Sequence, residues 1–175
     1  MRKKLNIGWI GSGFVGQVAH LRNFYLNKNV NISAISELRP NLAKKVQKKY
    51  NIPKIYNDYK KMISENNFDA VVAIVRRYNT AKVAKDVLGL NQNLFTEKPM
   101  APSFKLANEL VNLSKKKKLV YVIGNMRRFD DGIKFVKNIL SNKSKIRNDL
   151  GELINFSSFC YAGYDYCNID GDIKT

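Results

Sequence analysis

Two continuous apolar runs, at residues 70–75 (AVVAIV) and 119–124 (LVYVIG), restrict the possible folds more than any other feature of the chain. Runs of this length without polar alternation are typical of strands that are buried on both faces, as in a parallel sheet. We therefore expect a parallel sheet covered by helices on both sides. The 175 residues, 45% of them apolar, are enough for one such domain, or for one domain and part of a second.

Further strand and helix patterns alternate around these two runs. Pro40 suits a first helical turn, Asn91 suits a left-handed helix end, and Ser103 suits an N-cap. Either Asn57 or Asp58 can cap the helix that runs to about Glu65. Repeated strand–helix units predict an α/β fold with a doubly wound parallel sheet. The predicted strands are 5–10, 31–36, 54–56, 70–75, 93–96 and 119–124, and the predicted helices are 14–26, 40–50, 58–65, 80–90, 104–114 and 131–140.

Residues 11–16 read GSGFVG, a G-x-G-x-x-G motif between a predicted strand and a predicted helix. This is the context in which the motif binds a dinucleotide. Gly11 permits the tight turn, Gly13 lets the backbone approach a pyrophosphate, and Gly16 lets helix and strand pack closely. The helix N-terminus adds N–H groups and a positive dipole end. The candidate cofactor-binding loop is Gly11, Ser12, Gly13, Phe14, Val15 and Gly16.

An acidic residue follows the second predicted strand. Glu37 lies 21 positions after Gly16 (37 − 16), near the separation of about 20 that a ribose contact requires in dinucleotide folds. Its carboxylate can accept hydrogen bonds from ribose hydroxyls and would repel a 2′-phosphate, so we expect NAD rather than NADP. Arg39 leaves NADP open, because a nearby arginine can accommodate that phosphate. An S-adenosylmethionine enzyme is the main rival, since it can use a similar loop and acid.

Residues 95–100 read FTEKPM and follow the fifth predicted strand. Ligands of such sheets bind at the carboxyl ends of the strands. Lys98 can therefore hydrogen-bond a substrate hydroxyl near the nicotinamide and stabilise an oxygen that gains negative charge. Glu97 is a candidate partner that fixes the lysine, and Pro99 sets a turn compatible with a cis peptide bond. The alternative is an ordinary surface ion pair, which contributes little.

Composition excludes several other classes of protein. The formal net charge of +17 is compatible with a nucleic-acid partner, but the lysines are scattered over predicted solvent faces, so we expect none. No apolar stretch reaches the ~20 residues of a membrane span. The N-terminal run reads as a strand rather than a signal peptide, which favours a cytoplasmic protein. We expect Cys160 and Cys167 to be reduced, and with His20 as the only histidine we expect no metal site.

Together these motifs resemble the N-terminal half of the Gfo/Idh/MocA family of oxidoreductases, which act on sugars, inositols and related polyols. The resemblance extends over residues 5–160, and the Glu-Lys-Pro motif is its most specific part. The matching segments are GSGFVG for the cofactor loop, SELRP (36–40) for the acidic position, TEKPMA (96–101) for Glu-Lys-Pro, RRFD (127–130) for the Arg-Phe motif and GEL (151–153) for the start of the second domain.

The resemblance implies a Rossmann domain and a role for individual residues. Lys98 would be the catalytic lysine that contacts the substrate, Glu97 would lie beside the nicotinamide, and Arg128 would lie near the active-site cleft. His20 falls in the first helix, where the family often has a histidine without a catalytic role, so we interpret it as a packing or capping residue. The implied reaction is hydride transfer between NAD(P) and a secondary hydroxyl of a small carbohydrate, namely a sugar, a sugar derivative or a cyclic polyol.

The chain departs from the family pattern in three places. Arg76 and Thr80 stand where the family usually has a proline and a histidine, and Asn91 stands where it favours glycine. No histidine follows His20, although the family's general base is typically a histidine of the second domain. The base could be Lys98, a tyrosine or a group outside the chain, and we expect the acidic residues near the C-terminus to be loop residues: Asp165, Asp170 and Asp172.

The polar segment at 142–152 predicts a domain boundary. We assign residues 1–147 to the dinucleotide-binding domain and 148–175 to the beginning of an incomplete α+β second domain, because residues 153–166 alternate like a strand of a different, more open sheet. The chain is then a fragment of a homo-oligomeric enzyme, expected to bind NAD weakly without useful turnover. The alternatives are a non-catalytic nucleotide-binding module and, less favoured, a basic nucleic-acid-binding domain.

Overall fold

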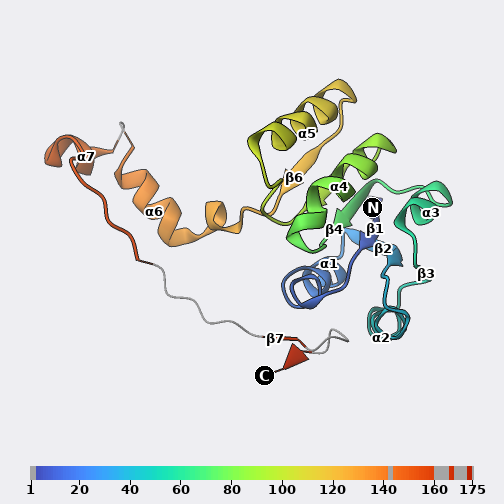
Figure 1. Ribbon diagram of the computed structural model, residues 1–175. Helices are drawn as coiled ribbons and strands as arrows, with labels where there is room; N and C mark the ends of the chain where they lie inside the picture. Colours follow the sequence, from blue (N-terminus) through green and yellow to red (C-terminus); the bar gives the residue numbers. More distant parts are fainter. Residues whose placement is uncertain (1–2, 142–143, 160–165, 168–172, 175) are drawn as a thin grey trace. The chain divides into compact units, whose positions relative to one another are not determined.

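The computed structural model describes residues 3–141, 144–159, 166–167 and 173–174. Contacts within the chain divide it into two compact units, residues 1–124 with 165–175 and residues 125–164. The six-stranded sheet lies in the first of them (Figure 1).

Six parallel strands form one sheet in the order β3-β2-β1-β4-β5-β6. The chain runs outward from β1 to β3, returns to β4 beside β1, and runs outward again on the other side. This is the doubly wound order, with its switch point between β1 and β4, and it confirms the predicted fold class. The strands are β1 (Leu5–Ile10), β2 (Val30–Ser36), β3 (Lys54–Tyr56), β4 (Ala70–Ala73), β5 (Leu94–Thr96) and β6 (Tyr121–Ile123).

Helices connect successive strands, and several begin or end where the sequence predicts. Asp58, rather than Asn57, caps α3 by accepting the N–H of Lys60, and Ser103 caps α5 by accepting the N–H of Leu106. Asn91 adopts a φ of 60° after α4. The helices of this unit are η1 (Gly16–Leu21), α1 (Arg22–Leu26), α2 (Pro40–Tyr50), α3 (Tyr59–Ser64), α4 (Arg77–Gly89) and α5 (Phe104–Lys116).

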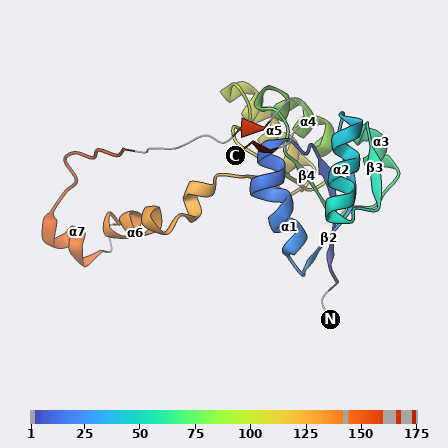
Figure 2. The same cartoon turned by 90° about the horizontal axis from the view of Figure 1, so that it is seen from below.

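Two hydrophobic clusters cover the two faces of the sheet. On one face, Trp9 and Ile7 of β1 pack with Leu21 of η1 and with the apolar side of α2. On the other face, Ile10 of β1 packs with the apolar sides of α3, α4 and α5. Alternate residues of β1 thus point to opposite clusters, as the pleat requires. Helices α1 and α2 are neighbours in Figure 2. The rings of Tyr25 and Tyr50 connect them edge to face, with ring centroids 5.4 Å apart.

The first helix differs from the prediction in its winding. Residues 14–26 are helical as expected, but Gly16–Leu21 form a π-helix, η1, rather than α-helix. A π-helix is hydrogen-bonded from i to i+5. Gly16 and Leu21, five positions apart, are accordingly both buried. Helix α4 also differs, since it begins at Arg77 and not at Thr80.

The prediction that residues 119–124 form a strand buried on both faces is wrong about burial. Tyr121–Ile123 form β6, but β6 is the last strand of the sheet and pairs only with β5 within it. Val120 is 62% exposed and Val122 is 46% exposed. A run of apolar residues indicates a strand without indicating how many neighbours the strand has, so an edge strand was mistaken for a central one.

The second unit contains η2 (Met126–Phe129), α6 (Asp131–Ile139) and α7 (Lys145–Leu150). Helix α7 falls in the polar segment predicted as a boundary; Lys and Arg are good helix formers, and Gly151, at a φ of 81°, ends the helix. Residues 153–159, predicted as part of a strand, have no regular structure. In the first unit, β7 (Tyr166–Cys167) and β8 (Ile173–Lys174) pair antiparallel.

Across the part of the chain that the structure describes, no helix combines the length and apolar character that a membrane span needs. The domain boundary at 147 stays a prediction.

Candidate cofactor-binding and active site

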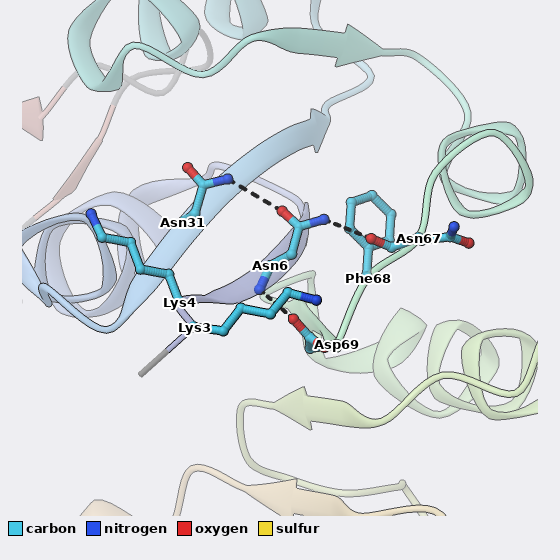
Figure 3. Close-up of a pocket in the computed structure, with 7 residues that line it drawn as sticks. All are labelled: Lys3, Lys4, Asn6, Asn31, Asn67, Phe68 and Asp69. Carbon is cyan, nitrogen blue, oxygen red and sulfur yellow. Dashed lines mark hydrogen bonds between the residues drawn. The ribbon is translucent and has the colours of Figure 1, made fainter. Parts of the chain in front are cut away.

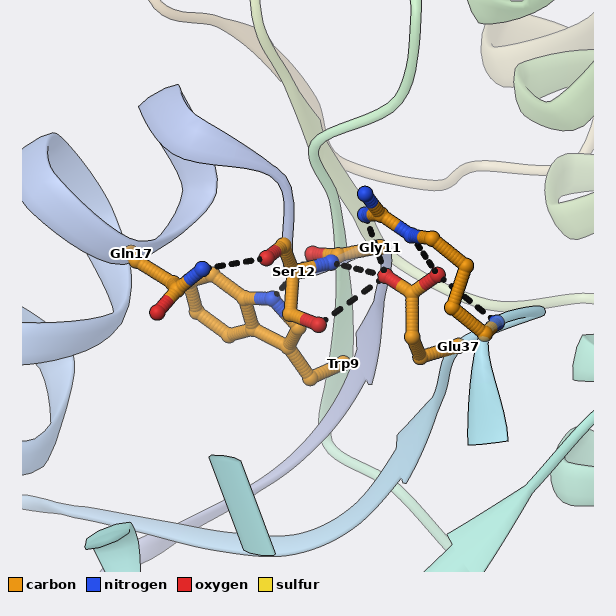
Figure 4. A network of polar contacts seen from close by, with 6 residues as sticks. Trp9, Gly11, Ser12, Gln17 and Glu37 are labelled. Carbon is orange, nitrogen blue, oxygen red and sulfur yellow. Dashed lines mark hydrogen bonds and ion pairs between the residues drawn. The ribbon is translucent and has the colours of Figure 1, made fainter. Parts of the chain in front are cut away.

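The glycine loop begins at the carboxyl end of β1 in a turn that only glycine fits. Gly11 has a φ of 82°, and a Cβ built on it would lie 2.4 Å from the carbonyl oxygen of Ile74, which follows β4. Its N–H donates to the carbonyl of Ser36 at 2.9 Å. Its carbonyl accepts from the indole of Trp9 at 2.7 Å (Figure 4). The loop is therefore fixed between the ends of β2 and β4, at the switch point of the sheet.

The rest of the loop leaves open space at one position. A Cβ built on Gly13 would meet only the Nη2 atom of Arg39, at 3.9 Å. A Cβ built on Gly16 would lie 3.1 Å from the carbonyl of Gly11, so Gly16 permits the close packing of helix on turn. Phe14 is half-buried and Val15 is 44% exposed. The backbone at Gly13 thus has the clearance that close approach of a pyrophosphate requires.

Glu37, at the end of β2, is buried and anchored to this loop. Its Oε2 atom accepts hydrogen bonds from the N–H and the hydroxyl of Ser12, both at 2.9 Å (Figure 4). Its Oε1 atom accepts the N–H of Arg39 at 3.1 Å and the Nε–H of the same residue at 3.0 Å. The side-chain amide of Gln17, in η1, donates a hydrogen bond to the carbonyl of Ser12 at 2.8 Å and so connects the helix to the loop.

The pKa of Glu37 is lowered from its ordinary value of 4.5. Burial alone would raise it, but the hydrogen bonds from Arg39 and Ser12 favour the charged form and together outweigh burial. A carboxylate offers about four acceptor positions. Ribose hydroxyls would therefore compete for Glu37 with the Arg39 side chain, which is 39% exposed. The sequence predicts that Glu37 contacts the ribose, but it does not predict that Arg39 occupies the same carboxylate.

Replacing Glu37 by glutamine is expected to lower the free energy of unfolding by about 1–2 kcal/mol at pH 7, because two charge-assisted contacts become weaker. A pKa lowered in the folded state stabilises the protein above the unfolded value of 4.5. The stabilisation is lost as the pH falls through the folded pKa. Urea unfolding of both proteins between pH 7 and pH 3 should show the difference shrinking; the exposed Glu65→Gln is the control. A constant difference would contradict this account.

Lys98 follows β5 at the same edge of the sheet as the glycine loop, and its side chain is exposed. The peptide bond between Lys98 and Pro99 is cis. The contacts of Glu97 differ from the expected pairing with the lysine ammonium: its Oε2 atom accepts the backbone N–H of Lys98 at 3.0 Å, and its Oε1 atom contacts Nε2 of His20 at 2.7 Å. Glu97 thus holds the backbone of the lysine turn.

Sequence reasoning missed the part that His20 plays. It packs edge to face on Phe95, with ring centroids 5.4 Å apart, as its interpretation as a packing residue predicts. Its contact with Glu97 joins residues 77 positions apart. A histidine in the first helix carries no local signal for a partner after the fifth strand, so only the fold reveals the pair.

The other described candidate residues lie on β6, at the start of α4 and in η2. Burial raises the pKa of Tyr121, which opposes a role as proton acceptor. Thr80 is buried, whereas Arg76 is exposed and donates to the hydroxyl of Tyr78 at 2.9 Å. Arg128 belongs to η2 of the second unit. Four predicted loop or thiol residues lie outside the described residues: Cys160, Asp165, Asp170 and Asp172.

A polar pocket lies at the opposite end of the sheet (Figure 3). Asn6 is its centre: it donates from its side chain to the carbonyl of Asn67 at 2.6 Å and from its backbone to Asp69 at 2.7 Å. These residues lie at or before the amino ends of their strands, away from the edge where doubly wound sheets bind ligands. The lining residues are Lys3, Lys4, Asn6, Asn31, Asn67, Phe68 and Asp69. Among the described residues, no group of three or more His, Cys, Asp or Glu side chains could hold a metal ion.

Known proteins share both this fold and this sequence pattern. Inositol 2-dehydrogenase of Salmonella typhimurium is 30% identical over 79% of the chain and 42% of its own length. Myo-inositol 2-dehydrogenase of Thermotoga maritima is 25% identical over 79% of the chain and 41% of its own length. The crystal structure of myo-inositol 2-dehydrogenase from Lactobacillus plantarum superposes with a TM-score of 0.76 at 26% identity, covering 87% of this chain and 44% of that one.

The chain spans about two fifths of the length of these curated relatives. The profile of the Gfo/Idh/MocA oxidoreductase family, NAD-binding Rossmann fold, matches residues 5–125, from the start of β1 to the residues just after β6. That stretch holds the glycine loop, Glu37 and Lys98. The chain therefore belongs to the Gfo/Idh/MocA oxidoreductase family, through its NAD-binding Rossmann domain.

Proposed function

We propose that this chain binds NAD and supplies the cofactor-binding part of a dehydrogenase that acts on a secondary hydroxyl of an inositol-like polyol or a sugar. One observation carries the proposal: the Ser12–Glu37 pair and Lys98 lie at the carboxyl edge of the same parallel sheet. That edge is the ligand-binding edge of doubly wound folds. Relatives of 25–30% identity that are named inositol dehydrogenases support the substrate class.

Individual residues of the chain would have separate roles in cofactor binding and in catalysis. Glu37 would accept hydrogen bonds from the adenosine ribose hydroxyls after the Arg39 side chain turns outward. The open space at the backbone of Gly13 would admit the pyrophosphate. The nicotinamide of NAD supplies a hydride acceptor. Lys98 would donate a hydrogen bond to the substrate oxygen and so orient the carbon that loses hydride. The hydroxyl proton would pass to a base outside these residues. Tyr121 is a poor candidate, because burial raises its pKa.

The cofactor part of the proposal is tested by titrating the chain with NADH and with NADPH and following nicotinamide fluorescence. We expect NADH to bind more tightly, because Glu37 repels a 2′-phosphate. Arg39→Ala should weaken NADPH binding about tenfold, the loss of one charge-assisted contact, and should leave NADH affinity unchanged or higher, because the competitor for Glu37 is removed. Lys44→Ala, a basic residue of the following helix, is the control. Equal loss for both nucleotides would contradict the assignment of Arg39. If neither NADH nor NADPH binds, the proposal fails.

The catalytic part is tested on the complete gene product with NAD and a panel of inositols and sugars. Lys98→Met should lower kcat about 100-fold, the effect of removing one donor to a developing oxyanion, and leave the Kd for NADH nearly unchanged. NADH binding without turnover on any polyol would instead support a non-catalytic nucleotide-binding module. Salt-sensitive binding of DNA or RNA in place of NADH would support a basic nucleic-acid-binding domain.

A further inference from the structure

The histidine of the first helix and the glutamate of the Glu-Lys-Pro motif form a pair that the proposed reaction does not yet use. Nε2 of His20 lies 2.7 Å from Oε1 of Glu97, and each side chain is only 15% exposed. A carboxylate oxygen accepts hydrogen bonds, so the imidazole donates its Nε2–H. Bonds of this kind, short and with a charged partner, are stronger than neutral ones and more directional.

The Glu97 carboxylate is held on its remaining sides as well. Its second oxygen accepts the backbone N–H of Lys98 at 3.0 Å. Gly124, just after β6, leaves the room that the carboxylate fills: a Cβ built there would lie 3.0 Å from Oε1 of Glu97 and 3.2 Å from the ring of Phe95. The position of the Lys98 backbone therefore depends on a carboxylate whose own position depends on His20.

The imidazole is itself fixed by its neighbours. It packs on Phe95 of β5 at an interplanar angle of 62°. It also lies in the last turn of η1, the π-helix that begins at Gly16 of the glycine loop, and Gln17 of the same helix donates to the Ser12 carbonyl at 2.8 Å. His20 is thus connected through one short helix to the loop expected to receive the pyrophosphate, and through Glu97 to the turn that carries Lys98.

We propose that His20 is a positioning residue that couples the glycine loop to the Lys98 turn through Glu97. This rests on the proposed function, because it assumes that the cofactor binds along this edge and that Lys98 acts there. His20 touches neither reacting atom in the proposal. It sets the orientation of Glu97, and Glu97 sets the backbone from which the lysine side chain extends.

The solitary histidine permits a direct spectroscopic test. An untagged chain has one imidazole, so its ring signals in a nitrogen–carbon-labelled sample belong to His20. We expect the Nε2 resonance to mark a protonated, hydrogen-bonded nitrogen, to move in Glu97→Gln, and to move on saturation with NADH. In Asn23→Ala, a change on the exposed side of the next helical turn, the resonance should stay in place. A His20 signal unaffected by both Glu97→Gln and NADH would overturn the proposal.

Binding of NADH to the unchanged chain and to four variants, His20→Phe, His20→Gln, Glu97→Gln and one double variant, gives the second test. His20→Phe keeps the ring contact but removes the donor, and should weaken NADH binding about tenfold; His20→Gln keeps an N–H donor and should recover most of that loss. The double variant His20→Phe/Glu97→Gln should bind no more weakly than the weaker single variant, because both act through one contact. Additive losses, or equal losses in His20→Phe and His20→Gln, would reject the coupling. If the unchanged chain binds no NADH, the proposed function fails instead.

Discussion

Replacing Gly11 by alanine is expected to lower the free energy of unfolding by about 4 kcal/mol. The residue has a φ of 82°, a conformation that costs an L-residue about 1–2 kcal/mol. The new Cβ would also lie 2.4 Å from the Ile74 carbonyl oxygen, so the segments that follow β1 and β4 would have to move apart. Overpacking of this kind costs about 1–3 kcal/mol. Urea unfolding at pH 7, followed by circular dichroism, measures the change.

Gly89→Ala is the matched control for this variant. Gly89 is the last residue of α4, and a Cβ built on it would meet no atom within 4 Å. Alanine should leave the protein unchanged or stabilise it by up to about 1 kcal/mol. If Gly11→Ala unfolded at the same urea concentration as Gly89→Ala, the turn could not be as tightly enclosed by β4 as the structure has it.

Gly13→Asp is expected to weaken NADH binding about 1000-fold, roughly 4 kcal/mol, without loss of the fold. The only atom that the new Cβ would meet is Nη2 of Arg39, at 3.9 Å, so the substitution fits the free protein. It puts a carboxylate where the backbone must approach a pyrophosphate, and combines charge repulsion with steric exclusion. NADH fluorescence titration measures the affinity, and thermal unfolding checks that the fold remains.

A control variant is needed to separate the general effect of an added negative charge from its effect at the glycine loop. Asn23→Asp adds one negative charge on the exposed surface of α1, away from the glycine loop, and should change NADH affinity by less than about twofold. Binding of NADH that survives Gly13→Asp would mean that the nucleotide does not use the glycine loop. Nucleic-acid affinity that survives it would favour the basic nucleic-acid-binding alternative.

The two glycines show how far the sequence can predict the site. Their spacing, with a strand before and a helix after, specifies the loop, because only a few backbone conformations connect those elements. The motif also predicts that Gly11 makes the tight turn and Gly13 admits the pyrophosphate, but it does not predict which atoms lie opposite each glycine in the folded chain. The structure supplies those atoms: the carbonyl of Ile74, just after β4, lies opposite Gly11, and open space lies opposite Gly13.

Patterns of neighbouring residues likewise predicted the helices and strands better than they predicted the burial and the long-range contacts of these elements. All six strands of the main sheet, and the caps at Asp58 and Ser103, follow from apolar runs and short polar signals that act within a few residues. The burial of β6, the π-winding of η1 and the pairing of His20 with Glu97 depend on residues distant in the sequence. No local pattern encodes those contacts, so sequence reasoning alone missed them.

The edge position of β6 has a consequence for how copies of this chain behave in solution. An edge strand with exposed apolar side chains offers unpaired backbone groups as a template for strands of another molecule. The formal net charge of +17 opposes such encounters, because every copy repels every other. That repulsion reaches about 10 Å at 0.1 M salt and about 3 Å at 1 M. We therefore expect the positive charge to oppose self-association through this edge, and to oppose it less as salt is added.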